Sequence, residues 1–240
     1  MLVAGLVVLA LVILVGTVYY LCFSPSSQLF GRFPFRAATT SKVLALTFDD
    51  GPNSPHTEAL LAVLRKHGVR ATFFLVGKNL ERSPHTGQAI VADGHEVGNH
   101  TYAHAFSNYF SPALFKRDVE HNQGLIAGIT GTRPTLFRPP WLFRLPWILH
   151  LVQSLGLTPV SGVFGSEREV FQPSEKSMVR RALQKVKPGM IIIFHDGYNA
   201  AGGYRKKTIT AIDQLIPKLK GRGYNFVSVQ ELLKFSQPET

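Results

Sequence analysis

LALTFDDGPN, residues 44–53, is an apolar run that ends in two adjacent aspartates and then turns at a glycine and a proline. The apolar part predicts a buried strand, and the Gly-Pro pair predicts its end. Two neighbouring carboxylates repel each other, and burying either is costly unless a cation or hydrogen bonds compensate the charge. Asp49 and Asp50 therefore indicate a site that also holds positive charge.

Similar apolar segments recur along the chain and alternate with helical patterns. The predicted strands span residues 42–50, 71–77, 96–100, 136–139, 158–162, 190–196 and 225–229. Several are almost continuously apolar, which is typical of parallel strands covered on both faces. Six or seven β/α units in about 200 residues predict an α/β fold with a parallel barrel, complete or incomplete, in preference to an open doubly wound sheet.

Two helices can also be placed from the sequence. Isoleucines at 209, 212 and 216 recur at helical spacing and indicate a helix that buries one face. Ser111 before Pro112 predicts the N-cap of a second helix, which runs toward Gly128.

Residues 1–23 contain no charged side chain. As a helix they would span roughly 35 Å, which is enough to cross a bilayer core of about 30 Å. A cleaved signal peptide usually has a basic start and a small-residue cleavage site, and neither is clear in this segment. A helix in the core of a soluble protein keeps a polar face, which this segment lacks. We expect a transmembrane anchor, with Tyr19 and Tyr20 at the interface. Residues 24–40 then form a linker, and residues 41–240 form the main domain.

Lys and Arg outnumber Asp and Glu by 26 to 15, for a net charge of +11. The basic clusters are either a solvated helix face or an attraction to an anionic surface such as lipid head groups or an acidic cell-envelope polymer. No nucleic-acid-binding motif is present, so we expect no nucleic-acid partner, and no obligate protein partner is evident. The only cysteine, Cys22, excludes an intrachain disulfide and gives no information about redox compartment.

Polar residues follow several predicted strands, and the carboxyl ends of these strands would meet in either architecture. His100 and His104 are four residues apart and can present both imidazoles on one face of a helical turn. With one carboxylate they form the donor set of a catalytic divalent metal. One aspartate can then bind the metal while its neighbour acts as general base. The alternative, that the aspartates only cap a turn, explains one better than two.

Three further residues lie at predicted strand ends. His195 is either a buried core histidine or a proton donor at the rim. Arg138, if buried, needs an anionic partner, and an aspartate at the same rim is the obvious one. Trp141 packs in the core or forms a wall for a sugar ring.

Four motifs in order resemble the polysaccharide deacetylase family, the NodB-homology domain of carbohydrate esterase family 4. They are TFDDGP (47–52), HTYAH (100–104), FRPPW (137–141) and IIFHD (192–196). The resemblance covers residues 42 to about 233. It implies a distorted, incomplete (β/α) barrel of the TIM type that removes acetyl groups from N-acetylated sugars in peptidoglycan, chitin or a related polymer.

The resemblance also implies a divalent metal held by three ligands, namely Asp50, His100 and His104. Zinc is favoured, and cobalt, manganese or iron also fit this set. Asp49 would be the base, Arg138 would hold Asp49 in place, and His195 would be the acid.

The backbone N–H of Trp141, after Pro140, would belong to the oxyanion and substrate site.

Two stretches depart from the family pattern. The family carries an aspartate that orients the acid histidine, often in an Asp-Trp pair, but this chain has GVFGSERE (162–169) there. Glu167, with a longer reach, or Asp196 could take that place, and Leu142 stands where a glycine often follows the aromatic residue. A carbohydrate-binding protein with degraded catalysis and a deacylase of a small amide therefore remain alternatives to a polysaccharide N-deacetylase.

The orientation in the membrane rests on opposing arguments. Arg32, Arg36 and Lys42 follow the apolar segment, and positive charge beside a span usually stays in the cytoplasm. The polymers that the family acts on lie outside the cytoplasm. We therefore expect a single-pass membrane protein with an extracytoplasmic catalytic domain.

Overall fold

β1 (Val43–Gly51) is the central strand of a parallel sheet in the computed structural model, which describes residues 1–236. It pairs with β2 (Thr72–Leu75) on one side and with β7 (Ile191–His195) on the other. All of its residues are buried, so the apolar run 44–48 has neighbours on both faces. This position explains why the sequence there lacks the alternation of a half-exposed strand.

The strand order is β5-β4-β3-β2-β1-β7-β6, and the sheet curls without closing because β5 and β6 remain its edges. The outer strands are β3 (Glu96–Asn99), β4 (Leu136–Phe137), β5 (Thr158–Pro159) and β6 (Val163–Phe164), while β8 (Asn225–Phe226) pairs with the start of β1. The predicted incomplete barrel is confirmed. β6 was not predicted as a separate strand, because it begins directly after the segment 158–162 that was assigned to the preceding strand.

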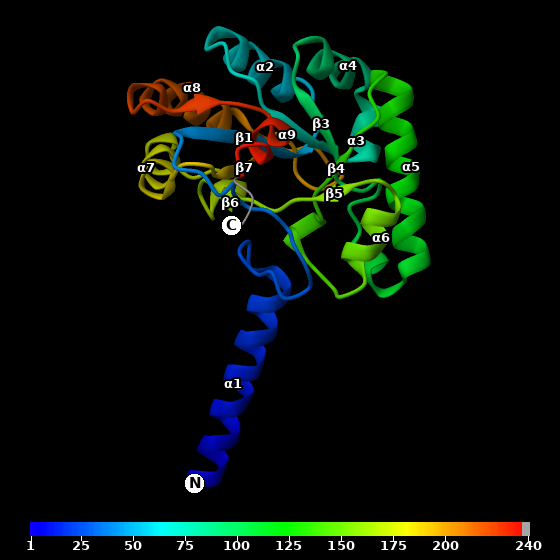
Figure 1. The fold of residues 1–240 in the computed structure, drawn as a ribbon, viewed down its shortest axis with the longest axis vertical. Coiled ribbons are helices and arrows are strands. Elements are labelled where there is room, and N and C mark those ends of the chain that lie inside the picture. Colours follow the sequence, from blue (N-terminus) through cyan, green and yellow to red (C-terminus); the bar gives the residue numbers. More distant parts are fainter. Residues whose placement is uncertain (237–240) are drawn as a thin grey trace.

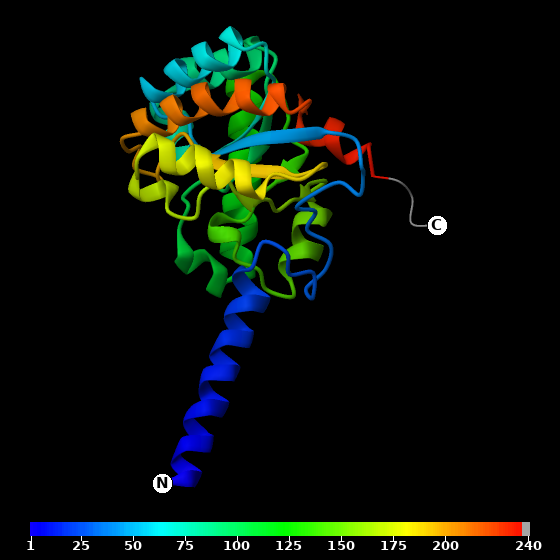
Figure 2. The same cartoon turned by 90° about the vertical axis from the view of Figure 1, so that its left-hand side faces the viewer.

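Helices cover the sheet (Figures 1 and 2). They are α2 (His56–Lys66), α3 (Gly77–Arg82), α4 (Pro84–Ala92), α5 (Pro112–Thr130), α6 (Ile148–Ser154), α7 (Glu175–Lys185), α8 (Lys206–Gly221) and α9 (Val229–Leu233), with short 3-10 turns η1 (Phe106–Phe110), η2 (Pro140–Leu142) and η3 (Glu169–Phe171). The isoleucines of α8 are buried in the main core, as their spacing predicts. Ser111 caps α5 as expected, and the helix ends at Thr130, two residues beyond Gly128, with left-handed Gly131 as its C-cap.

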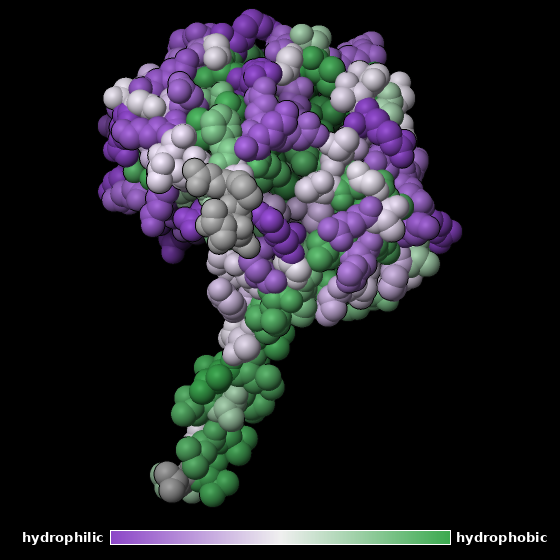
Figure 3. Space-filling model, viewed as in Figure 1, coloured by the Kyte–Doolittle hydropathy of each residue, from purple (hydrophilic) through white to green (hydrophobic). Residues whose placement is uncertain are grey.

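α1 (Leu2–Phe23) projects away from the rest of the molecule (Figure 1), and its surface is apolar along its length (Figure 3). Residues Val3–Phe23 have a mean hydropathy of 2.7 and are not buried inside the structure. By length and composition the helix can cross a membrane, although a signal sequence passes the same test.

Residues 24–40, the predicted linker, lie against the barrel. The amides of Ser161, after β5, and Ile191, in β7, donate to the carbonyls of Pro34 and Phe35 at 2.8 and 3.1 Å. The side chain of Phe33 is fully buried. The segment therefore connects α1 to the domain, but it is not a flexible tether, because it is hydrogen-bonded to the barrel between β5 and β7.

Candidate active site

The sheet brings the predicted strand-end residues to one edge. Asp49 in β1 lies beside His195 in β7 in the strand register. His100 and Arg138 directly follow β3 and β4, which pair with each other at this end. Parallel strands place their carboxyl ends on the same side, so these polar side chains converge.

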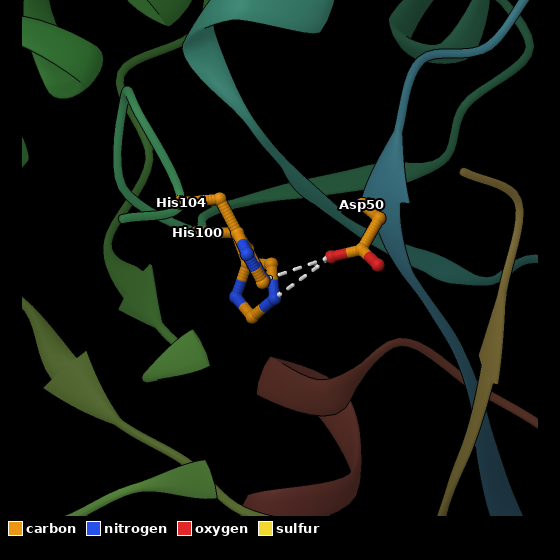
Figure 4. Close-up of side chains that lie close together, drawn as sticks. All are labelled: Asp50, His100 and His104. Atoms are coloured by element: carbon orange, nitrogen blue, oxygen red, sulfur yellow. Dashed lines mark ion pairs between the residues drawn. The ribbon is translucent and has the colours of Figure 1, made fainter. Parts of the chain in front are cut away.

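Asp50, His100 and His104 form a compact group (Figure 4). The Nε2 atoms of His100 and His104 lie 3.4 and 3.1 Å from Asp50 Oδ1. All three side chains are buried, and their possible ligand atoms lie within 4.8 Å of one another. The sequence suggested that the two histidines share a helical turn, but the structure shows that they do not. They lie in a loop in which Thr101 and His104 have φ angles of 67° and 47°. A spacing of four residues does not distinguish a helical turn from such a loop.

The surrounding hydrogen bonds suit these three residues to a divalent cation. His100 Nδ1 lies 2.7 Å from the carbonyl of Arg138, so this nitrogen donates and Nε2 keeps its lone pair toward Asp50. The backbone N–H of Asn199 donates to Asp50 Oδ2 at 2.8 Å, which leaves Oδ1 facing the imidazoles. Burial alone would raise the pKa of Asp50, but the imidazoles of His100 and His104, when protonated at Nε2, donate to its carboxylate and lower that pKa well below its usual value. Two imidazole nitrogens and one carboxylate oxygen are a donor set for zinc and related metals.

Asp49 is paired with Arg138, as the sequence suggested. Arg138 Nη1 donates to Asp49 Oδ1 at 2.7 Å and to Thr47 Oγ1 at 2.7 Å, while Nη2 donates to the Ser161 carbonyl at 2.9 Å. The guanidinium lies over the ring of Phe74, 4.0 Å from its centroid, and the arginine is fully buried. This clamp limits the rotation of the Asp49 carboxylate and leaves Oδ2 outside the ion pair.

His195 has a buried partner that the sequence reasoning missed, Glu169. His195 Nδ1 lies 2.7 Å from Glu169 Oε2, and Thr208 Oγ1 donates to the other carboxylate oxygen. Burial lowers the pKa of His195, but the charge and hydrogen bond of Glu169 outweigh it, with help from Asp50 and Asp49, and raise the pKa to about 9. The imidazole is therefore protonated at neutral pH.

Neither of the two suggested partners reaches His195. Glu167 is half exposed and pairs with Lys185 and Arg181. Asp196 is buried and accepts a hydrogen bond from Thr57 Oγ1 at 2.5 Å, and burial raises its pKa to about 7. Glu169 lies two residues beyond Glu167 in the same atypical stretch, so the sequence indicates the right segment for the partner of His195 but not the right residue.

A cavity of about 330 Å³ opens above these groups and is lined by both aspartates, His100, His104 and His195. Trp141 forms part of its wall, and its ring meets that of His104 edge to face at 4.4 Å. Trp141 and Leu142 both have φ angles of 56°, which turn the backbone toward the cavity in η2. Pro140 is buried, its carbonyl accepts a hydrogen bond from Tyr109, and as a proline it has no N–H to donate. Tyr19 and Phe23 of α1 also line the cavity, which the sequence did not suggest.

Comparison with known proteins gives consistent matches. Residues 36–160 match the family model described as polysaccharide deacetylase. A peptidoglycan-N-acetylglucosamine deacetylase of Bacillus cereus is 31% identical over 206 residues, covering 85% of this chain and 94% of that protein.

Solved structures agree with these sequence matches. A peptidoglycan N-acetylglucosamine deacetylase bound to a substituted N-oxidanyl-benzamide is 28% identical, with a TM-score of 0.79 over 86% of this chain and 95% of that one. A family 4 acetyl xylan esterase from Clostridium thermocellum, in complex with a cobalt ion, is 32% identical, with a TM-score of 0.72 over 80% of this chain and 91% of that one.

Proposed function

We propose that this chain, which belongs to the polysaccharide deacetylase family, is a metal-dependent hydrolase that removes N-acetyl groups from the sugars of a peptidoglycan- or chitin-like polysaccharide. One observation carries the proposal. A three-residue metal-ligand set, a clamped carboxylate and a buried, protonated imidazole all face the same cavity. These are the groups that hydrolysis of an unactivated amide requires.

Asp50, His100 and His104 would hold the metal ion. Zinc is our first choice for this donor set, while cobalt, manganese and iron suit it as well. When bound, the ion supplies positive charge that polarises the acetyl carbonyl and acidifies water. It also compensates the negative charge of Asp50, which answers in part how two adjacent carboxylates coexist in a buried strand end.

Asp49 is proposed as the general base. Its Oδ1 is held 2.7 Å from Arg138 Nη1, and the buried guanidinium supplies the opposite charge that a buried carboxylate needs. Asp49 therefore accepts a proton from the attacking water through an oriented oxygen.

His195 is proposed as the general acid. Its Nδ1 is held by Glu169, so its Nε2–H is the proton that it can deliver to the cavity. The new C–O bond to water forms on the acetyl carbon, and the C–N bond breaks as His195 protonates the sugar nitrogen. The products are acetate and a free amino sugar, and the proton taken by Asp49 balances the one given by His195.

The backbone N–H of Trp141 is proposed to donate to the carbonyl oxygen as it becomes negative. The left-handed backbone at Trp141 and Leu142 supports this role, because it turns the chain at the cavity wall. The Trp141 side chain, which is 39% exposed, then offers an aromatic surface to the sugar ring.

α1 is proposed to remain attached as a single membrane-spanning anchor, with the catalytic domain outside the cytoplasm, where cell-wall polymers lie. Its apolar length supports the span, and the docking of residues 24–40 on the barrel supports retention.

The test is acetate release from N-acetylglucosamine oligomers and from peptidoglycan, measured with and without a chelator. We expect release that stops with chelator, returns with added Zn²⁺ and is abolished in Asp49→Asn. A correctly folded, metal-loaded protein that binds these glycans but releases no acetate would refute the proposal and favour a binding role.

A further inference from the structure

The end of α1 is built into the wall of the catalytic cavity. Tyr19 and Phe23 line this cavity together with the metal-site histidines. The Phe23 ring packs on that of Phe143 with centroids 4.7 Å apart, and Phe143 packs on Phe106 at 5.0 Å. Phe106 in turn meets Trp141 at 5.4 Å, so aromatic rings connect α1 to the active site without a break.

Buried hydrogen bonds fix this end of the helix in place. The amide of Arg144 donates to the carbonyl of Cys22 at 2.9 Å. The guanidinium of Arg144 donates to the carbonyls of Ser24 and Ser27 at 2.8 and 2.7 Å, and the arginine is only 1% exposed. Since a guanidinium so buried needs these acceptors, moving α1 away from the domain would leave it unpaired, and this opposes such motion.

A second cavity of about 450 Å³ runs beside α1 and shares Tyr19, Phe23 and Phe164 with the catalytic one. Tyr20, Pro25 and Val163 extend its mostly apolar wall along the helix. The two cavities therefore adjoin across these shared side chains, and we refer to the pair as the groove, one end over the catalytic groups and the other along the apolar helix.

This groove opens where a membrane surface would lie. Tyr19 and Tyr20 are the residues expected at the interface, and Phe23 is only about 6 Å further along the helix at 1.5 Å per residue. The adjacent helix α7 carries four basic residues and one acidic residue, which suits an anionic surface. A glycan that enters the cavity from this side must therefore be held close to the bilayer.

We propose that the substrate is an N-acetylated glycan attached to a membrane lipid, with its sugar in the catalytic cavity and its lipid-proximal part in the groove beside α1. This inference rests on the proposed deacetylase function and on retention of α1. It predicts that the anchor does more than concentrate the enzyme at the membrane, because α1 itself contacts the substrate.

The experiment uses the full-length, zinc-loaded protein in vesicles of phosphatidylethanolamine and phosphatidylglycerol. One substrate is an N-acetylglucosamine tetramer free in solution, and the other is the same tetramer joined to a dialkylglycerol in the same vesicles. Acetate release gives kcat and KM for each. We expect the KM for the lipid-attached tetramer, expressed as bulk concentration, to be at least tenfold lower than the KM for the free tetramer.

Membrane attachment alone concentrates the second substrate, so variants isolate the contact with α1. The preference for the lipid-attached tetramer is the KM of the free tetramer divided by that of the lipid-attached one. Tyr19→Ala should reduce this ratio at least threefold, and Phe164→Ala, in the body of the domain, should do the same. The matched control is Val18→Ala, one residue away on α1 and 51% exposed, which should leave the preference unchanged.

The outcomes separate the two proposals. If the wild-type protein releases acetate from neither tetramer, the proposed function fails. If it releases acetate from both with equal KM, or if Tyr19→Ala and Phe164→Ala behave like Val18→Ala, the deacetylase stands and the lipid-attached substrate is overturned. If mass spectrometry of the protein extracted from membranes shows that α1 has been removed, the proposal of a lipid-attached substrate is overturned as well.

Discussion

Replacing Glu169 by glutamine removes the negative charge beside His195 while keeping a side chain of the same size. In the wild type the pKa of His195 is raised to about 9. The difference from the ordinary value of about 6.5 corresponds to about 3 kcal/mol in favour of the imidazolium. Burial persists in the variant and lowers the pKa, while Asp50 and Asp49 still raise it, so we expect a value near 6.5.

The assay is the pH dependence of kcat for acetate release. His195 must be protonated to act as the acid, so the basic limb of the profile should move down by about 2.5 units in Glu169→Gln. At pH 8 the protonated fraction would fall from about nine tenths to about 3%, which predicts a loss of about thirtyfold. At pH 6 about three quarters of the variant would be protonated, and most of the activity should return.

Glu167→Gln is the matched control, because Glu167 is the other glutamate of the same stretch and pairs with Lys185 instead. Its basic limb should stay at the wild-type position. An unshifted limb in Glu169→Gln, or a shift of the same size in Glu167→Gln, would refute the assignment of Glu169 as the residue that positions and charges His195.

Four further predictions address the remaining groups. His104→Ala should lose most of the bound metal, measured by elemental analysis, and should lose activity with it. Asp49→Asn should keep its metal but lose about 10²- to 10⁴-fold in kcat, and loss of metal there would contradict separate roles for the two aspartates. Arg138→Met should lower the free energy of unfolding in urea by about 3–5 kcal/mol, because Asp49 is left buried without a partner, and adding Asp49→Asn should recover part of that loss. Since the pKa of His195 is raised, its contribution to stability is complete below about pH 6.5 and is lost as the pH rises through about 9, so the urea midpoint should fall across this window in the wild type and less in Glu169→Gln.

Much of the fold and site could be predicted because parallel strands impose a simple rule. Strand positions follow from apolar runs, and polar residues directly after such strands meet at one edge. Asp50, His100 and Arg138 were placed in this way, and the structure brings them together as expected. The resemblance to a known family then supplied roles that the spacing alone left open.

The residues that could not be placed lie in irregular segments. Glu167 and Glu169 differ by two positions in a stretch that is neither helix nor extended strand over most of its length. Side-chain direction there depends on backbone angles that no periodic pattern reveals, so the sequence could not tell the exposed glutamate from the buried one. The helical turn expected at His100 and His104 was wrong for the same reason: positive φ angles at Thr101 and His104 carry the loop instead.

By itself, the sequence determined the parallel α/β barrel, the apolar first helix and the strand ends at which Asp50, His100 and Arg138 stand. Apolar runs and the turns that end them are local patterns, so burial and strand direction can be read from neighbouring residues. Only the tertiary structure decided which groups from distant segments complete the site. Glu169 reaches His195 through a turn after β6, Arg138 crosses from β4 to Asp49, and Phe23 of α1 closes one wall. These contacts depend on how loops and termini dock on the barrel, which is settled by packing in three dimensions and not by local pattern.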